Sequence, residues 1–171
     1  MPPWSDPTEP GPTMEIRFFK PRGPYGFLSN YFRYRFTLEC RQWESVEHFY
    51  QAAKFDHLPG LAERIRELPC PDAAKSFARD RARLWRPDWE SVRNLVMWEA
   101  LQAKFGQSAF LTRELLLTGD ARLCEASPFD PYWGLGPDGT GRNRLGRLLM
   151  RLRQQRSQRG EPTAHELVSA A

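Results

Sequence analysis

The chain has 171 residues, of which 40% are apolar, and this is enough for one domain with its own hydrophobic core. Its formal net charge of +4 is too small to require a nucleic-acid partner, and no apolar run reaches the roughly 20 residues of a membrane-spanning helix. Cys40, Cys70 and Cys124 lack the spacing of a disulfide framework, and the first residues lack the pattern of a signal peptide. We therefore expect a cytoplasmic protein with reduced thiols and no membrane contact.

The elements predicted along the chain are mainly helices. Short alternating patterns predict strands, and apolar residues three or four positions apart predict helices. The predicted strands cover residues 15–19, 34–43 and 121–126, and the predicted helices cover 45–55, 61–68, 73–84, 87–106, 108–117 and 143–156. We expect a mainly α (α+β) fold, with a single multihelical domain over residues 14–156 and a small β-sheet. Residues 1–13, which are rich in proline, and residues 157–171 are expected to be flexible tails.

The helix predicted over residues 45–55 carries a polar stripe beside its apolar face. Glu47, Gln51 and Lys54 recur at helical spacing, and Glu47 falls in the first turn, where the helix dipole favours a carboxylate. The stripe is either an ordinary solvated face or a set of one acid, one amide and one ammonium group directed into a cleft.

A second group of candidate residues lies in a loop rich in proline and glycine. Glu125, Asp130 and Trp133 stand beside Gly134, the first of four glycines that allow a close approach of backbone to a ligand. Asp130 before a proline is equally typical of a turn, and Trp133 is equally typical of a core residue.

The C-terminal helix is strongly basic. Residues 142–159 contain seven arginines and no acidic residue. This face is either solvated or able to bind phosphate, on a nucleotide-like ligand or on a nucleic-acid backbone.

Motifs for metal binding and nucleotide hydrolysis are missing from the sequence. The three histidines lack the spacing of an H-E-x-x-H or Cys/His site, and there is no Walker A loop. The G-x-G-x-x-G pattern at residues 134–139 does not follow a strand of a βαβ unit, and residues 26–30 lack the pattern of a nucleophile elbow. We expect no metal and no cofactor.

Six short motifs follow one another along most of the chain. They are Gly26-Phe27-Leu28-Ser29-Asn30, Glu47-His48-Phe49-Tyr50-Gln51-Ala52, Lys104-Phe105, Leu115-Leu116-x-Thr118-Gly119, Glu125-x-Ser127-Pro128-x-Asp130-x-x-Trp133-Gly134 and Gly141-x-Asn143-x-Leu145-Gly146. In this order, over roughly residues 16–154, the sequence resembles the YbiA-like family, also called the NADAR superfamily. It departs from the family pattern at Tyr31-Phe32, where the two aromatic residues are exchanged, and at Ala78-Arg79, where the family tends to have Gly-Arg.

The resemblance implies an N-glycosidase on a mainly helical fold. Family members are associated with cleaving the bond between ribose and nitrogen, either in phosphorylated riboflavin-pathway intermediates or in ADP-ribosylated guanine, including guanine in DNA. Such a reaction gives the anomeric carbon oxocarbenium character, so a nearby carboxylate stabilises the transition state. A second acid protonates the departing base or activates water. We assign Glu47 and Asp130 to these roles, in either order.

Other residues are expected to bind the substrate. Lys54 would contact phosphate or ribose hydroxyls and keep Glu47 ionised, and an aromatic side chain would stack on the heterocycle. An arginine would meet the phosphate, either Arg79 or one in the last helix. The predicted binding residues are Asn30, Gln51, Lys54, Arg79, Trp85, Glu125, Trp133, Gly134 and Asn143, with Phe27 as a further stacking candidate.

Two other classes of protein fit part of the pattern. A non-catalytic module that binds ADP-ribose or a nucleotide would use the aromatic and basic residues without needing two acids. A plain nucleic-acid-binding helical domain would need neither Glu47 nor Asp130. The expected partners are a small phosphoribosyl or ADP-ribosyl substrate and DNA that carries ADP-ribosylated guanine, and the sequence leaves the oligomeric state open.

Overall fold

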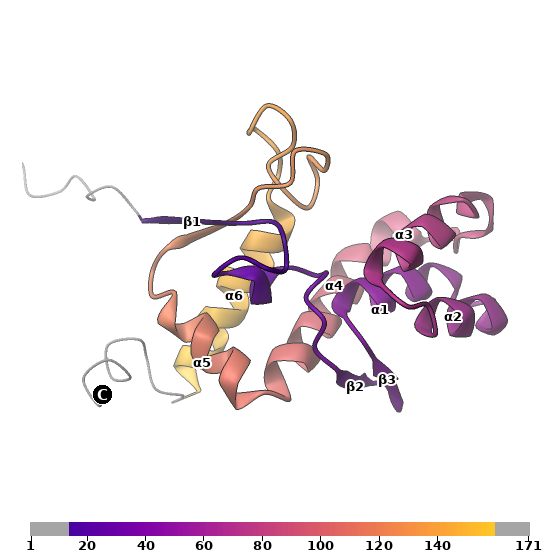
Figure 1. Cartoon of the computed structure of the whole chain (residues 1–171), viewed down its shortest axis with the longest axis horizontal. Helices are drawn as coiled ribbons and strands as arrows, with labels where there is room; N and C mark the ends of the chain where they lie inside the picture. Colours follow the sequence, from indigo (N-terminus) through magenta and orange to yellow (C-terminus); the bar gives the residue numbers. More distant parts are fainter. Residues whose placement is uncertain (1–13, 160–171) are drawn as a thin grey trace, which may run out of the picture.

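The computed structural model describes residues 14–159, which form six α-helices and two pairs of short strands (Figure 1). The long helix α4 (Trp89–Gly106) packs against α1 (Val46–Ala52) on one side and against α5 (Ala109–Leu117) and α6 (Arg144–Gln158) on the other. α2 (Pro59–Arg66) and α3 (Pro71–Arg79) complete the group around α1. The predicted mainly helical fold is confirmed. Each helix within residues 14–159 is too short or too polar to cross a lipid bilayer.

The strands form two separate small sheets. β1 (Glu15–Phe18) pairs in parallel with β4 (Arg122–Glu125), so that the start of the domain lies beside the chain that leads into the glycine-rich loop. β2 (Phe36–Leu38) and β3 (Arg41–Trp43) form an antiparallel hairpin. The prediction of one strand over residues 34–43 is therefore wrong. Glu39 and Cys40 adopt left-handed backbone angles, with φ of 52° and 59°, and make the two-residue turn that this hairpin needs.

The boundaries of three helices differ from the predicted ones. α2 begins at Pro59, which occupies the first turn because its missing N–H is not needed there. The helix predicted over residues 73–84 ends at Arg79, and a separate turn of 3₁₀-helix covers Ala82–Leu84. α6 continues to Gln158, two residues beyond the predicted end. Residues 1–13 and 160–171 of the two predicted tails lie outside the described residues.

α1 lies at the centre of the fold. All seven of its residues are buried, and it contacts α2, α3, α4 and β3. Ser45 caps the helix by accepting a hydrogen bond from the His48 N–H, as predicted. The His48 ring is hydrogen-bonded to Ser45 Oγ at 2.8 Å and to the Leu68 carbonyl at 3.1 Å. These contacts fix the direction in which α1 presents its polar side chains.

A buried lysine fixes the segment before β2. Lys104 of α4 is fully buried, and its Nζ donates to the carbonyl oxygens of Phe27 at 2.6 Å and Ser29 at 3.1 Å. Burial lowers the pKa of Lys104 to about 7. This contact holds the short 3₁₀-helix Gly26–Leu28 against α4 and so places Asn30 and Tyr31, which follow it.

Candidate active site

One cavity of about 690 Å³ collects most of the predicted site residues. It is lined by α1, α3, the N-terminal half of α4, residues 19–21 and 29–31, and the end of β4 with the loop that follows it. Leu145 at the start of α6 also contributes to the lining. Nine of the predicted residues line it: Asn30, Glu47, Gln51, Lys54, Arg79, Trp85, Glu125, Asp130 and Trp133. A cavity of this size is suited to a ligand as large as a nucleotide.

Asn30, Glu47 and Gln51 form the part of the cavity that we call the floor. Each is less than 9% exposed, so the polar stripe of α1 is not a solvated face. Gln51 Nε2 donates to Glu47 Oε1 at 2.7 Å, and the Glu47 N–H donates to the Asn30 carbonyl at 3.1 Å. The three residues are thus linked to one another through Glu47.

The charge on Glu47 is opposed by its burial. Removal of the carboxyl group from water raises its pKa, while the Gln51 hydrogen bond and the ammonium groups of Lys75 and Lys54 act in the opposite direction. Lys54 thus acts on Glu47 in the expected direction, because its ammonium group favours the charged carboxylate, although burial is the larger influence on the pKa of Glu47.

Lys54 lies against aromatic side chains. Its Nζ is 3.9 Å from the centroid of the Trp85 ring, and it lies 5.4 Å from that of Tyr50 and 5.5 Å from that of Trp89. Burial lowers the pKa of Lys54 to about 8, with Glu47 acting in the opposite direction. The amine therefore carries its positive charge below pH 8 and loses much of it above.

The end of β4 and the loop after it contribute two more acids, Glu125 and Asp130. Asp130 Oδ1 accepts hydrogen bonds from the backbone N–H groups of Tyr132 and Trp133, both at 2.8 Å, so Asp130 also has the turn-forming role that its position before a proline indicates. Burial first, and then the negative charges of Asp130 and Glu47, raise the pKa of Glu125 to about 7. Glu125 is thus an acid that can hold a proton near neutral pH.

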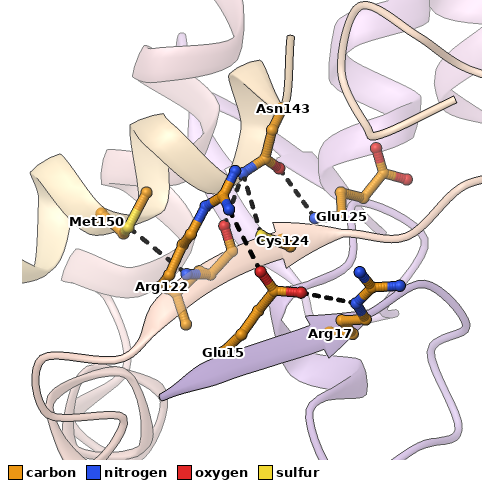
Figure 2. Close-up of polar contacts among 8 residues, drawn as sticks. Glu15, Arg17, Arg122, Cys124, Glu125, Asn143 and Met150 are labelled. Atoms are coloured by element: carbon orange, nitrogen blue, oxygen red, sulfur yellow. Dashed lines mark hydrogen bonds and ion pairs between the residues drawn. The ribbon is translucent and has the colours of Figure 1, made fainter. Parts of the chain in front are cut away.

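Two predicted residues, Gly134 and Asn143, do not line the cavity but contact Glu125. A Cβ on Gly134 would come within 2.7 Å of the Glu125 carbonyl and carboxyl oxygens, so only glycine leaves room for that side chain. Asn143 Oδ1 accepts from the Glu125 N–H at 2.9 Å, and its Nδ2 donates to the Leu123 carbonyl at 2.8 Å (Figure 2). The expectation that Asn143 hydrogen-bonds the substrate is replaced by a role in joining β4 to α6.

Of the three aromatic side chains that were predicted to stack on a ligand, two line the cavity and one does not. Trp133 forms part of the wall, and its Nε1 donates to the Tyr50 hydroxyl at 3.1 Å. Trp85 lines the cavity beside Lys54 and donates to the Ala78 carbonyl at 2.9 Å. Phe27 packs instead on Phe105 in the core and does not line the cavity, so it is unable to stack on a ligand there.

Basic side chains stand at the edge of the cavity, and we call Lys75, Arg79 and Arg93 the rim. Arg79 was predicted, while Lys75 and Arg93 were missed. Arg93 lies 3.6 Å above the Tyr132 ring and pairs with Glu90 at 2.8 Å, which in the sequence looks like an ordinary helical ion pair. Lys75 precedes Arg79 by one helical turn, and that spacing was an available signal. The arginines of α6 do not line the cavity.

No group of three or more His, Cys, Asp or Glu side chains within residues 14–159 is arranged to hold a metal ion. The cavity therefore offers carboxyl groups, amides and cations as its chemical groups, with aromatic rings between them.

Comparisons with known proteins identify relatives of this chain. The NADAR domain family matches residues 17–156. N-glycosidase YbiA of Escherichia coli K12 is 42% identical over 140 residues, which are 82% of this chain and 87% of that protein. A riboflavin biosynthesis protein of Vibrio vulnificus is 42% identical over 142 residues, 82% of this chain and 38% of that protein. The NMR structure of Escherichia coli YbiA aligns with a TM-score of 0.79 at 40% identity, over 86% of this chain and 88% of that chain.

The fold and these relatives define a hydrolase of N-glycosyl bonds. More narrowly, the chain belongs to the NADAR family.

Proposed function

We propose that the protein hydrolyses the bond between ribose and an amine nitrogen in a phosphorylated ribosyl-amine. The observation that carries the proposal is the pair of largely buried acids, Glu47 and Glu125, which share one cavity with Asp130 and have raised pKa values. Buried carboxyl groups with different environments are how glycosidases obtain one proton donor and one carboxylate at the same pH.

The environments of the two glutamates suggest their roles. Glu47 accepts a hydrogen bond from Gln51 and has two ammonium groups nearby, and both features favour its charged form. Glu125 Oε2 is buried without a hydrogen-bond partner among residues 14–159, and Asp130 and Glu47 repel its charge. Glu47 is thus the carboxylate that stabilises the oxocarbenium-like transition state, and Glu125 protonates the departing amine while water supplies the hydroxyl at the anomeric carbon.

The other residues complete the site. Asp130, first assigned with Glu47, raises the pKa of Glu125 and is the remaining candidate for activating water. The rim of Lys75, Arg79 and Arg93 suits a phosphate group, and Trp85 and Trp133 offer faces for the heterocycle. Lys54 adds a cation below pH 8. We place the reaction in the cytoplasm.

Two substrate classes fit this cavity. A phosphoribosyl-amine from the early riboflavin pathway has one phosphate for the rim, and the name of the Vibrio vulnificus relative favours it. ADP-ribosylated guanine, free or in DNA, is the second candidate. It is supported by Arg142 and Arg144, whose guanidinium groups lie 5.7 Å and 6.0 Å from the Tyr132 ring, outside the cavity but beside its rim.

A release assay without added metal tests the proposal. A ribosylamino-pyrimidine phosphate and an oligonucleotide with ADP-ribosylated guanine are offered to the wild type, to Glu47→Ala and to Asp130→Ala. Release from one substrate, lost in both variants, supports the glycosidase and identifies its class. Release from neither, with ADP-ribose still bound, would support the non-catalytic binding module instead.

A further inference from the structure

Three oxygen atoms in the cavity are buried and lack a hydrogen-bond partner among residues 14–159: Asn30 Oδ1, Gln51 Oε1 and Glu125 Oε2. Such atoms are rare in folded proteins, because a buried acceptor without a donor loses its hydrogen bonds to water and gains nothing in return. All three belong to residues that line the same cavity, so a bound ligand is the natural source of the missing donors.

The two amides of the floor are held in place. The hydrogen bond from Gln51 Nε2 to Glu47 fixes which end of that amide is free, and it leaves Oε1 unpaired. Asn30 is anchored through its backbone, because its carbonyl accepts from the Glu47 N–H and the preceding Ser29 carbonyl accepts from Lys104. Asn30 is 8% exposed and Gln51 is 3% exposed. Both oxygens are therefore buried acceptors in the cavity that Glu47 lines, with the Gln51 amide fixed by its bond to Glu47 and Asn30 fixed through its backbone.

This arrangement calls for a ligand with two neighbouring donors beside the reacting carbon. The two hydroxyl groups of a ribose at carbons 2 and 3 meet that requirement, and the anomeric carbon next to them would then lie near Glu47. We propose that Asn30 Oδ1 and Gln51 Oε1 accept hydrogen bonds from the ribose diol, and that the site selects ribose over 2-deoxyribose. This inference rests on the proposed function for its choice of sugar.

The preference for ribose over 2-deoxyribose follows from the free-energy cost of leaving a buried acceptor without a hydrogen-bond donor. A sugar without the 2-hydroxyl would bury at least one of the two acceptors permanently, and a site built to hydrogen-bond a hydroxyl rejects an analogue that lacks it. The rim would contribute equally to both sugars, because the phosphate at carbon 5 is the same.

The test is calorimetric titration of the full chain with ribose 5-phosphate, 2-deoxyribose 5-phosphate and arabinose 5-phosphate, in which the 2-hydroxyl points to the opposite face. We expect the last two to bind at least about tenfold more weakly than ribose 5-phosphate. In Asn30→Leu and Gln51→Met, the affinity for ribose 5-phosphate should fall toward that of the deoxy sugar. Arg79→Gln is the matched control, and it should weaken all three sugars by the same factor.

Equal binding of the three sugars by the wild type, or no binding of any at millimolar concentration, would overturn the inference. So would retained selectivity in both floor variants. These outcomes are separate from the release assay. Release with equal sugar binding would leave the glycosidase standing without the diol contact, whereas ribose selectivity without release would indicate a binding module with this same floor.

Discussion

At the scale of single residues, the site depends on carboxyl groups that differ in their surroundings. Glu47 was predicted from the helical spacing of its polar neighbours, and Asp130 from its loop. The special character of Glu125 could not be read from the sequence, because it arises from burial and from the charges of Asp130, which is near in the chain, and Glu47, which is distant. The same is true of Asn143, which was predicted to hydrogen-bond the substrate but which is 3% exposed and joins two elements.

The pKa of Glu125 predicts how activity depends on pH. As the proton donor, Glu125 acts only while it is protonated, so the rate constant for release should fall as the pH rises above about 7. In Glu125→Gln this decline should disappear together with most of the activity. Single-turnover rates from pH 5.5 to 9 measure it. A rate that stays level or rises across pH 7 in the wild type would remove Glu125 from this role.

The same group predicts a change in stability. The Glu125 pKa rises from 4.5 to about 7 on folding, so its contribution to stability is complete below pH 4.5 and is lost as the pH rises through 7. Glu125→Gln, which is neutral throughout, should be more stable than the wild type at pH 8 by about 1 to 3 kcal/mol, and little different at pH 4.5. Urea unfolding at both pH values measures the gain. A variant that is less stable at pH 8 would contradict the burial argument.

At the scale of elements, the helices were predictable because their apolar residues recur at a regular spacing, and Ser45 and Ser108 cap two of them. The start of α2 at Pro59 was missed. The β2–β3 hairpin was not predictable in this way. Its turn uses Glu39 and Cys40 at positive φ, where the usual signal would be Asn or Gly. The contact of α1 with the chain just before the glycine-rich loop, made by Tyr50 and Trp133, also results from long-range packing, which local patterns do not contain.

The turn itself can be tested by replacement. Glu39→Asn combined with Cys40→Gly supplies the residues that this type of turn prefers, at two exposed positions. We expect the double variant to be more stable by about 0.5 to 1 kcal/mol, with no change in activity. Urea unfolding at pH 7 measures this, and a loss of stability would show that the two residues do not have left-handed angles in solution.

The pKa of Lys104, which holds the segment that carries Asn30, predicts a second dependence of stability on pH. Its pKa falls from 10.5 to about 7 on folding, so its contribution to stability is present above pH 10.5 and is lost as the pH falls toward 7. The stability of the wild type relative to Lys104→Met should therefore rise between pH 7 and pH 10. Comparing unfolding at those pH values cancels the groups that the two proteins share. A constant difference would indicate that the lysine remains charged when folded.

At the scale of the whole molecule, charge is distributed unevenly around the cavity. Carboxyl groups lie inside, the rim is basic, and exposed arginines of α6 and its preceding loop continue outward from the rim. The sequence indicated this basic helix but not where it lies, and the structure shows that its arginines do not line the cavity, although Leu145 near its start does. Because these arginines lie outside the cavity, they would contact a DNA substrate but not a small ribosyl-amine phosphate.

Neutralising Arg142 and Arg144 should separate the substrate classes. In Arg142→Gln with Arg144→Gln, release from a small ribosyl-amine phosphate should stay within about twofold of the wild type, since neither residue lines the cavity. Affinity for a modified oligonucleotide should fall, and the slope of its logarithm against that of salt concentration should decrease by about 2. Lys75→Gln, from the rim, is the control that should weaken both substrates. An unchanged oligonucleotide affinity would show that the backbone passes elsewhere.

The most direct test of the central claim is single-turnover release of the amine at saturating substrate by Glu47→Gln and Glu125→Gln, which preserve side-chain size. The two roles predict that each substitution slows the chemical step by at least about 100-fold, while the dissociation constant of the substrate changes only a few-fold. Release at the wild-type rate in both variants would contradict the assignment of Glu47 and Glu125 to catalysis.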